Sequence, residues 1–257
     1  MRIIISPAKK MNADTDTLPY RGLPAFLDQT QQLLDRLRGM DEGELKKLWK
    51  CNDQIAALNV ERLRNMDLCK NLTPAIIAYE GIQYQYMAPD VFTQTAYDYV
   101  QEHLRILSGF YGVLRPLDGV TPYRLEMQSK LRMGDAKDLY AFWGEGLAQS
   151  VLDGTDCVVN LASKEYSVCV SRYLPKDKQM ITCVFGEEKE GKIIEKGTMC
   201  KMARGEMVRF MAENQIVDCG EIKRFARLGY RYSPEHSDER TYVFVLEKKT
   251  EKGQNFE

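Results

Sequence analysis

The stretch that most constrains the fold of this chain spans residues 100–127, where an apolar helical pattern gives way to glycines, prolines and single charges. Apolar side chains recur at helical spacing up to Leu107, which predicts an amphipathic helix that ends at Ser108-Gly109. Prolines then restrict the backbone close to each of two arginines. Charges on a rigid backbone beside a buried core favour a polar site over a solvated loop. The charged residues are Arg115, Asp118, Arg124 and Glu126.

Length and charge narrow the class of protein. The chain has 257 residues, enough for a sizeable core in one large domain or two small ones. A net charge of −1 gives no overall attraction to nucleic acid or membranes, so any anion site must come from local clustering. No apolar run approaches the roughly 18 residues of a membrane span, and the N-terminus is predicted to be a strand rather than a signal peptide. We therefore expect a cytoplasmic protein with no membrane partner.

The metal-binding residue types are sparse. The seven cysteines include no Cys-x-x-Cys pair, so the spacing of zinc and iron–sulfur sites is absent. Cys157 and Cys183 fall in apolar runs, which is typical of reduced thiols in a core. Only His103 and His236 offer imidazole ligands. The sequence therefore predicts no metal site and no cofactor.

Apolar periodicity divides the chain into short strands and amphipathic helices. No repeat or low-complexity linker interrupts it, so we expect one α+β (mixed α/β) domain over residues 1–257, with a mixed central sheet, surrounding helices and a disordered tail at 248–257. The second helix opens on Asp41, with Glu44 three residues later as in a capping box. Strands are predicted at 2–5, 73–81, 157–161 and 242–246, and a hairpin at 179–185 and 191–199. Helices are predicted at 24–38, 41–50, 53–65, 138–152 and 200–216.

Polar side chains gather at the ends of two predicted strands, which are common places for ligand sites. Ser6 and Lys9 follow the first strand at the spacing of a serine nucleophile activated by lysine, but the companion motifs of such hydrolases are missing. Lys9 is better interpreted as an anion contact or a solvated lysine. The second strand end carries Asn160, Ser163, Lys164 and Glu165.

A third group of charges lies on the predicted helix 200–216. Lys201 and Arg204 are three residues apart, so they share a face of the first turn, and Arg209 follows. Cations at a helix start favour a local anion site, and the alternative is a solvated face.

Six short motifs follow one another along the chain. In order, they are Ile5-Ser6-Pro7-Ala8-Lys9, Gly112-Val113-Leu114-Arg115-Pro116-Leu117-Asp118, Pro122-Tyr123-Arg124-Leu125-Glu126-Met127, Phe142-Trp143-Gly144, Asn160-Leu161-Ala162-Ser163-x-Glu165-Tyr166 and Lys201-x-Ala203-Arg204-Gly205. Taken together, they make the chain similar to the YaaA family of peroxide-stress proteins over essentially its whole length.

The resemblance implies a mixed α/β fold of its own and a cytoplasmic protein that limits peroxide damage and free intracellular iron. It also implies double-stranded DNA binding through a positively charged cleft with a helix-hairpin-helix-like element. That element corresponds here to the helix ending at Leu107 and the hairpin at 108–112. Its glycines, Gly109 and Gly112, are separated by two residues rather than the usual one, and they would let backbone N–H groups approach a phosphate.

Two functions therefore stay open, and a third interpretation is that the Arg–Glu pairs are buried structural ion pairs. In the first, cations line one cleft and contact DNA phosphates without reading sequence: Lys9, Arg115, Arg124, Lys164, Lys201, Arg204 and Arg209. In the second, the polar and acidic groups beside them (Asp118, Glu126, Asn160 and Glu165) form a pocket for a small phosphate-containing or nucleotide-like ligand. Glu126 or Glu165 would then act as general base.

Overall fold

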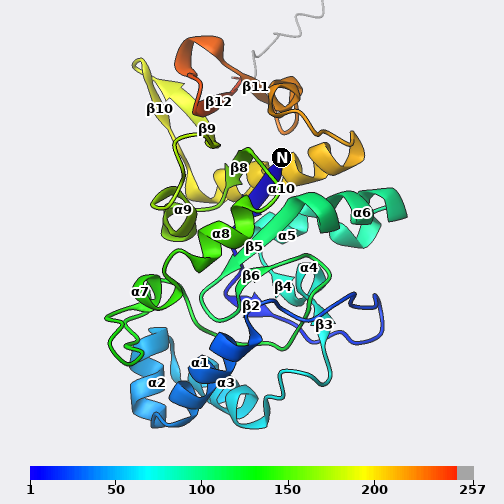
Figure 1. Cartoon of the computed structure of the whole chain (residues 1–257). Coiled ribbons are helices and arrows are strands. Elements are labelled where there is room, and N and C mark those ends of the chain that lie inside the picture. Colours follow the sequence, from blue (N-terminus) through cyan, green and yellow to red (C-terminus); the bar gives the residue numbers. More distant parts are fainter. Residues whose placement is uncertain (248–257) are drawn as a thin grey trace, which may run out of the picture.

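The computed structural model describes residues 1–247 and builds them around one mixed eight-stranded sheet, as the sequence predicts (Figure 1). The predicted tail at 248–257 lies outside the described residues. Five neighbouring strands run parallel in the order β12-β9-β8-β1-β5, while β11, β6 and β10 pair antiparallel with β12, β5 and β9. These strands are β1 (Arg2–Ile5), β5 (Leu104–Ser108), β6 (Gly112–Leu114), β8 (Cys157–Leu161), β9 (Gln179–Lys189), β10 (Lys192–Ile194), β11 (Tyr230–Tyr232) and β12 (Thr241–Leu246).

Strand β1 lies at the centre of the sheet, which explains its three consecutive isoleucines. Ile3, Ile4 and Ile5 have no exposed surface, because β5 and β8 flank the strand and helices cover both faces. From β1 the chain continues to β5 on one side, and from β8 it continues to β9 on the other. The boundary between β1 and β8 is therefore a topological switch point, the place where parallel sheets usually hold ligands at the carboxyl ends of their strands.

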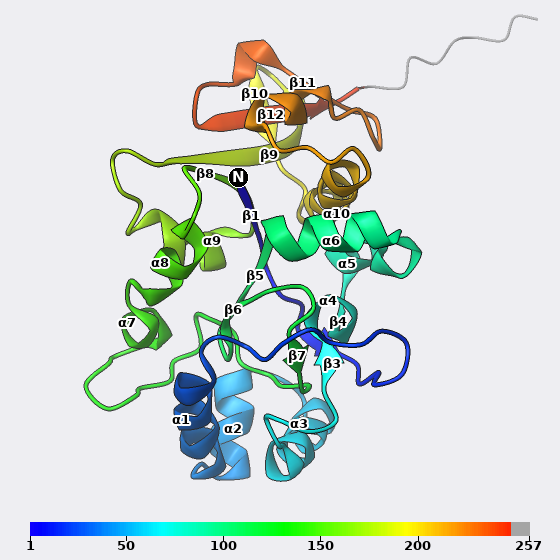
Figure 2. The same cartoon turned by 45° about the vertical axis from the view of Figure 1, so that its right-hand side comes forward.

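Helices pack on both sides of this sheet. Figure 2 shows α8 and α9 on one side, α5, α6 and α10 on the other, and the group α1–α3 at the end of the molecule away from β10–β12. The helices are α1 (Leu27–Arg38), α2 (Glu42–Trp49), α3 (Asp53–Asn65), α4 (Ala75–Ala78), α5 (Ile82–Met87), α6 (Gln94–His103), α7 (Leu139–Trp143), α8 (Gly146–Leu152), α9 (Lys164–Ser171) and α10 (Gly197–Glu213). The 3-10 helices are η1 (Pro89–Val91), η2 (Cys219–Arg224) and η3 (Pro234–His236). No helix in this part of the chain is both long and apolar enough to cross a bilayer.

The capping box predicted for α2 is confirmed. The Asp41 side chain accepts a hydrogen bond from the Glu44 backbone N–H at 2.8 Å, and Glu44 accepts one from the Asp41 N–H at 3.0 Å. Asn52 caps α3 in the same way by accepting from the Ile55 N–H. Only residues 50–52 separate α2 from α3, and the two helices pack against each other.

The structure differs from the sequence prediction around residue 104. Helix α6 ends at His103, and Leu104–Ser108 is strand β5 rather than the last turn of a helix, because its wholly buried side chains pair with β1. Residues 108–112 form a tight β-hairpin in which Ser108 pairs with Gly112. Gly112 has φ +73°, and a side chain on Gly109 would collide with the backbone of residues 125–127. The helix-hairpin-helix assignment at this segment is therefore wrong.

Three further boundaries differ. The predicted strand at 73–81 is two short strands, β3 (Thr73–Pro74) and β4 (Tyr79–Glu80), which pair with β7 (Gly119–Val120) and β2 (Lys10–Met11) around α4. The helix predicted at 138–152 breaks into α7 and α8 at Gly144, which has φ +52°. The second hairpin strand ends at Ile194, and α10 already begins at Gly197.

The prediction of seven reduced thiols is wrong for one pair. Cys157 of β8 and Cys219 of η2 form a disulfide, although 62 residues separate them in the sequence, so no local pattern could indicate it. Burial raises the pKa of Cys183 to about 12, in keeping with its predicted place in the core.

Candidate functional site

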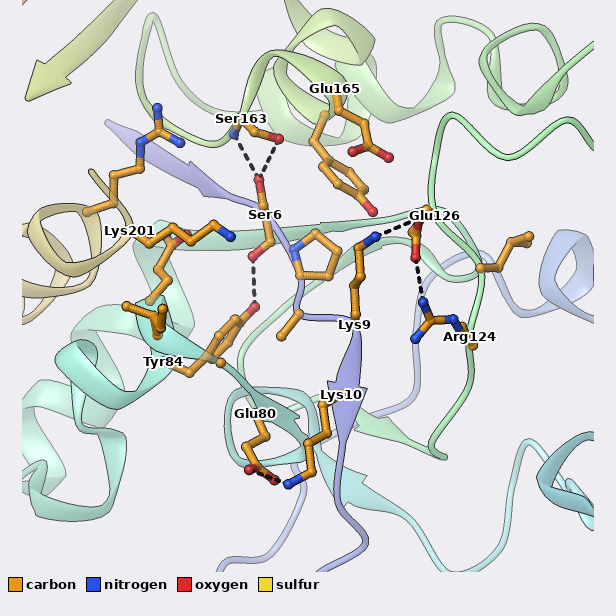
Figure 3. Close-up of a pocket in the computed structure, with 18 of the residues that line it drawn as sticks. Ser6, Lys9, Lys10, Glu80, Tyr84, Arg124, Glu126, Ser163, Glu165 and Lys201 are labelled. Carbon is orange, nitrogen blue, oxygen red and sulfur yellow. Dashed lines mark hydrogen bonds and ion pairs between the residues drawn. The ribbon is translucent and has the colours of Figure 1, made fainter. Parts of the chain in front are cut away.

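The carboxyl ends of β1 and β8 are joined by two serines. Ser6 follows β1, and its Oγ accepts a hydrogen bond from the backbone N–H of Ser163 at 2.8 Å and donates one to Ser163 Oγ at 3.2 Å. Ser163 is the N-cap residue of α9, but its side chain makes no capping hydrogen bond. The junction therefore places two hydroxyls and the N-terminus of an eight-residue helix at the topological switch point (Figure 3).

A cavity of about 440 Å³ opens beside this junction. Its charged lining consists of five cations and three carboxylates, so positive charge is in excess although the whole chain carries −1. The lining residues come from segments far apart in the sequence: Ser6, Pro7, Ala8, Lys9, Lys10, Glu80, Gly81, Ile82, Gln83, Tyr84, Tyr123, Arg124, Leu125, Glu126, Ser163, Glu165, Tyr166, Lys201 and Arg204.

One side of the cavity carries interleaved charges. Glu126 accepts from Lys9 Nζ at 3.1 Å and from Arg124 Nη2 at 3.4 Å, so one carboxylate holds two cations. The Lys9 side chain is 67% exposed, whereas the Arg124 side chain is only 11% exposed. Lys9 thus contacts Glu126 and has no bond to Ser6 among the described hydrogen bonds, which does not support a lysine-activated serine nucleophile.

Glu165 lies next to this charge cluster. Its carboxylate accepts hydrogen bonds from the backbone N–H of Gln128 at 3.2 Å and from the Gln128 side chain at 3.3 Å. Burial raises the pKa of Glu165, and the neighbouring charge of Glu126 raises it further, while the hydrogen bonds and Lys9 oppose the shift. A carboxyl group with a raised pKa beside a cation is a suitable general acid or base.

Tyrosines form the apolar part of the lining. Tyr84 donates a hydrogen bond to the backbone carbonyl of Ser6 at 3.0 Å. Tyr123 lies 2.6 Å from the Ser108 hydroxyl and 2.7 Å from the Tyr79 hydroxyl. Burial raises the pKa of Tyr84, Tyr123 and Tyr166, so these phenols stay neutral. They supply rigid walls rather than charge.

Helix α10 closes the opposite side with Lys201 and Arg204. Figure 3 shows the Lys201 amine directed toward Ser6 and Ser163. The position of α10 depends on Gly205, because a methyl group there would overlap the carbonyl oxygen of Gln83 in α5. This close approach gives the motif Lys201-x-Ala203-Arg204-Gly205 a structural reason for its last residue.

The cavity contains just over half of the predicted site residues. The structure brings together Lys9, Arg124, Glu126, Ser163, Glu165, Lys201 and Arg204. The others lie outside the cavity: Gly109, Gly112, Arg115, Asn160, Lys164 and Arg209. The expectation that seven cations line one cleft is therefore too broad, since three of them point elsewhere.

Local contacts explain these exceptions. Asn160 is buried in β8, where it bonds to Thr182 at 3.2 Å and accepts from the Ala162 N–H at 3.0 Å. Arg209 pairs with Glu213 on its own helix at 2.7 Å. Arg115 is exposed next to a turn, and Lys164 is exposed as the first residue of α9. Asp118, also suspected, is buried and accepts from the Arg115 N–H instead of facing a ligand.

Part of the cavity lining carries no clear signal in the sequence. Lys10 and Glu80 pair at the rim through the two-residue strands β2 and β4, and periodicity cannot detect strands of that length. Gln83 also lines the cavity, from α5. Away from the cavity, Glu188, Glu235 and His236 bring three potential metal-ligand atoms together. That group lies at the exposed surface and shares no residue with the cavity.

Comparison with known proteins identifies the family. The family model described as "Peroxide stress protein YaaA" matches residues 1–236. The chain belongs to the YaaA family of peroxide stress proteins. Among its relatives in this family, a UPF0246 protein of Lachnoclostridium phytofermentans is 56% identical over 245 residues, covering 95% of this chain and 96% of the relative. A UPF0246 protein of Agathobacter rectalis is 56% identical, covering 95% of this chain and 98% of the relative. A UPF0246 protein of Lactiplantibacillus plantarum is 51% identical, covering 96% of this chain and 100% of the relative.

Proposed function

We propose that this member of the YaaA family is a cytoplasmic protein that binds double-stranded DNA, without sequence preference, in the defence against hydrogen peroxide. The observation that carries the proposal is the excess of cations around the cavity. Lys9 and Lys10 at the rim are 67% and 69% exposed, and the exposed Lys201 reaches the same opening from α10. Exposed lysines on a shared rim can contact backbone phosphates and release counterions from DNA, whatever the base sequence.

The α2–α3 pair supports the same proposal. The family resemblance implies a helix-hairpin-helix-like element, and α2 and α3 are two packed helices joined by three residues. Lys47 in the last turn of α2 and Lys50 just after the helix are exposed, and Lys50 has a left-handed backbone conformation with φ 46°. We propose this pair as the second DNA contact. A further effect on free intracellular iron is proposed on the resemblance alone.

A second candidate function has its own observation in its favour. Glu126 and Glu165 lie inside the cavity, where they would repel a polyanion that passed through it. A small phosphate-containing or nucleotide-like ligand avoids this repulsion if its phosphate stays beside α10. In that case Glu165, with its raised pKa, is the better candidate for a general base than Glu126, which two cations hold.

Fluorescence anisotropy of a labelled duplex, titrated with protein at several salt concentrations, tests the proposal. Each phosphate contact contributes about −0.9 to the slope of log affinity against log salt, so Lys201→Ala and Lys50→Ala should each flatten the slope by about that amount. Lys176→Ala removes an exposed lysine outside the cavity and should leave the slope unchanged. Absence of duplex binding near physiological salt, or equal slopes for all variants, would contradict DNA binding at these sites.

A further inference from the structure

The cavity has two chemically different sides. Lys201 of α10 lies on one side, by Ser6, and Lys9 and Glu126 lie on the other with Glu165 near them (Figure 3). Arg204, one turn further along α10, also lines the cavity. The first side is cationic and carries hydroxyls. The second side presents carboxylate oxygens, which accept hydrogen bonds and repel anions. A ligand that fits both sides has a negative group at one end and neutral donor groups at the other.

The cationic side is able to bind an anion. Lys201 has no ion-pair partner among residues 1–247, and the nearest carboxylate to Arg204 is Glu195, with its oxygen 3.8 Å from Nη2. The N-terminus of α9 begins at Ser163 on the same side, and its dipole favours negative charge, although Glu165 in the first turn already supplies one carboxylate there. Lys201 and Arg204 would therefore be the main groups that hold a phosphate dianion, with the helix N-terminus as a smaller contribution.

Buried donors without partners concentrate at this cavity. Five buried side-chain polar atoms have no hydrogen-bond partner in the described part of the chain, and three of them belong to lining residues: Gln83 Nε2, Arg124 Nε and Arg204 Nε. Gln83 is only 7% exposed. Native proteins leave few buried donors unsatisfied, so this concentration favours a ligand that brings hydrogen-bond acceptors to the cavity. The other two atoms, on Arg2 and Trp49, do not line it.

The acidic side limits how much negative charge a ligand can carry. Glu126 lies close enough to Glu165 for its charge to help raise the pKa of Glu165, which burial raises most. A continuous DNA strand would bring a second phosphate toward these carboxylates, whereas the hydroxyl or amino groups of one sugar and base would donate to them. The volume of about 440 Å³ lies within the roughly 300–1,000 Å³ of small-ligand pockets, and the buried side chains of Tyr84, Tyr123 and Tyr166 form part of its wall.

We propose that this cavity binds a single terminal nucleotide, with its phosphate monoester between Lys201, Arg204 and the N-terminus of α9, and its sugar and base toward Glu126 and Glu165. This inference rests on the proposed phosphate-binding function of the cavity and specifies its ligand. The same chemistry comes from two sources, a free mononucleotide or the 5′-phosphorylated end of a DNA strand. An internal phosphodiester carries only one negative charge, and two of its oxygens are esterified. It therefore fits this site less well than a phosphate monoester.

Isothermal titration calorimetry with deoxyadenosine 5′-monophosphate, deoxyadenosine and inorganic phosphate tests the ligand class. The monophosphate should bind at least tenfold more tightly than the nucleoside and more tightly than inorganic phosphate. Lys201→Ala should weaken the monophosphate roughly tenfold or more, because it removes a charge-assisted hydrogen bond, and Lys176→Ala should not. Glu126→Gln should weaken the monophosphate while leaving inorganic phosphate unchanged.

A second experiment distinguishes a free mononucleotide from a 5′-phosphorylated DNA end as the ligand. It also distinguishes failure of the terminal-nucleotide site from failure of DNA binding. Binding is compared for a duplex with 5′-phosphates, the same duplex with 5′-hydroxyls, and a covalently closed dumbbell duplex without ends. A preference of tenfold or more for the 5′-phosphorylated duplex assigns the site to DNA ends, and monophosphate binding without that preference assigns it to free nucleotides. Equal binding of all three duplexes without monophosphate binding overturns the terminal-nucleotide site but leaves DNA binding intact. Monophosphate binding without any duplex binding overturns the DNA proposal alone.

Discussion

Ser6 Oγ accepts the backbone N–H of Ser163 at 2.8 Å, and this bond ties the carboxyl end of β1 to the start of α9. The two residues are 157 positions apart in the sequence. Because the bond crosses the switch point of the sheet, it fixes the strand end that carries Lys9 relative to the helix that carries Glu165. The contact therefore helps to set the geometry of the cavity at this junction.

Ser6→Ala should lower the free energy of unfolding by about 1–2 kcal/mol, because it leaves the Ser163 N–H without its partner. Ser163→Ala is the matched control: it keeps that N–H and loses only the hydroxyl contact at 3.2 Å, so its effect should be smaller. Urea denaturation of the two variants measures the difference. Equal destabilisation would show that the backbone N–H bond has no special role.

Gly205→Ala should be strongly destabilising, by about 2–3 kcal/mol or more, because the added methyl group would overlap the Gln83 carbonyl and force α10 away from α5. Gly197→Ala, at the start of the same helix, meets no atom within 4 Å and should be neutral or slightly stabilising. Thermal unfolding of both variants provides the comparison. A tolerated Gly205→Ala would contradict the close packing of α10 on the cavity wall.

Asp118 should make the stability of the protein fall as pH rises from about 4 to about 6. Burial raises its pKa from 3.8 to about 6, against the opposing effects of the Arg115 N–H and the charges of Arg115 and Arg105. The folded state therefore binds a proton at Asp118 more tightly than the unfolded state, and protonation of Asp118 stabilises the folded state. This contribution to the free energy of unfolding is complete below about pH 4 and lost above about pH 6. A shift of about two pKa units corresponds to at most about 3 kcal/mol.

Asp118→Asn removes this titration and retains an oxygen that can accept the Arg115 N–H. The free energy of unfolding of the variant, minus that of the wild type, should therefore increase by up to about 3 kcal/mol between pH 4 and pH 7. Urea denaturation across this pH range measures the difference. Parallel stability profiles for the two proteins would mean that Asp118 titrates normally.

Local sequence patterns were sufficient for elements whose signal is short and contiguous in the sequence. The isoleucines of β1, the apolar run of β8 and the capping box of α2 each carry their signal within a few residues, and all three are confirmed. The same patterns placed Ser163, Glu165, Lys201 and Arg204 at element ends. A parallel sheet brings such ends to one edge, so these residues of the site were predictable.

Long-range pairing accounts for most of the errors. Leu104–Ser108 has helical apolar spacing, but pairing with β1 converts it into a strand, and that partner lies about a hundred residues earlier. The disulfide between Cys157 and Cys219 likewise depends on the fold. Arg115 and Arg124 belong to the same predicted polar stretch, yet only Arg124 lines the cavity. Arg115 is exposed, and its backbone N–H donates to Asp118.

Protection of lysines by DNA shows directly whether the cavity rim binds phosphate. The protein is reductively methylated with and without saturating duplex, and the modified residues are quantified by mass spectrometry. Duplex should protect Lys9, Lys10 and Lys201 several-fold, while Lys176 and Lys192 should react equally in both samples. Protection confined to lysines outside the cavity, with Lys9 and Lys201 fully reactive in the complex, would contradict phosphate binding at the rim.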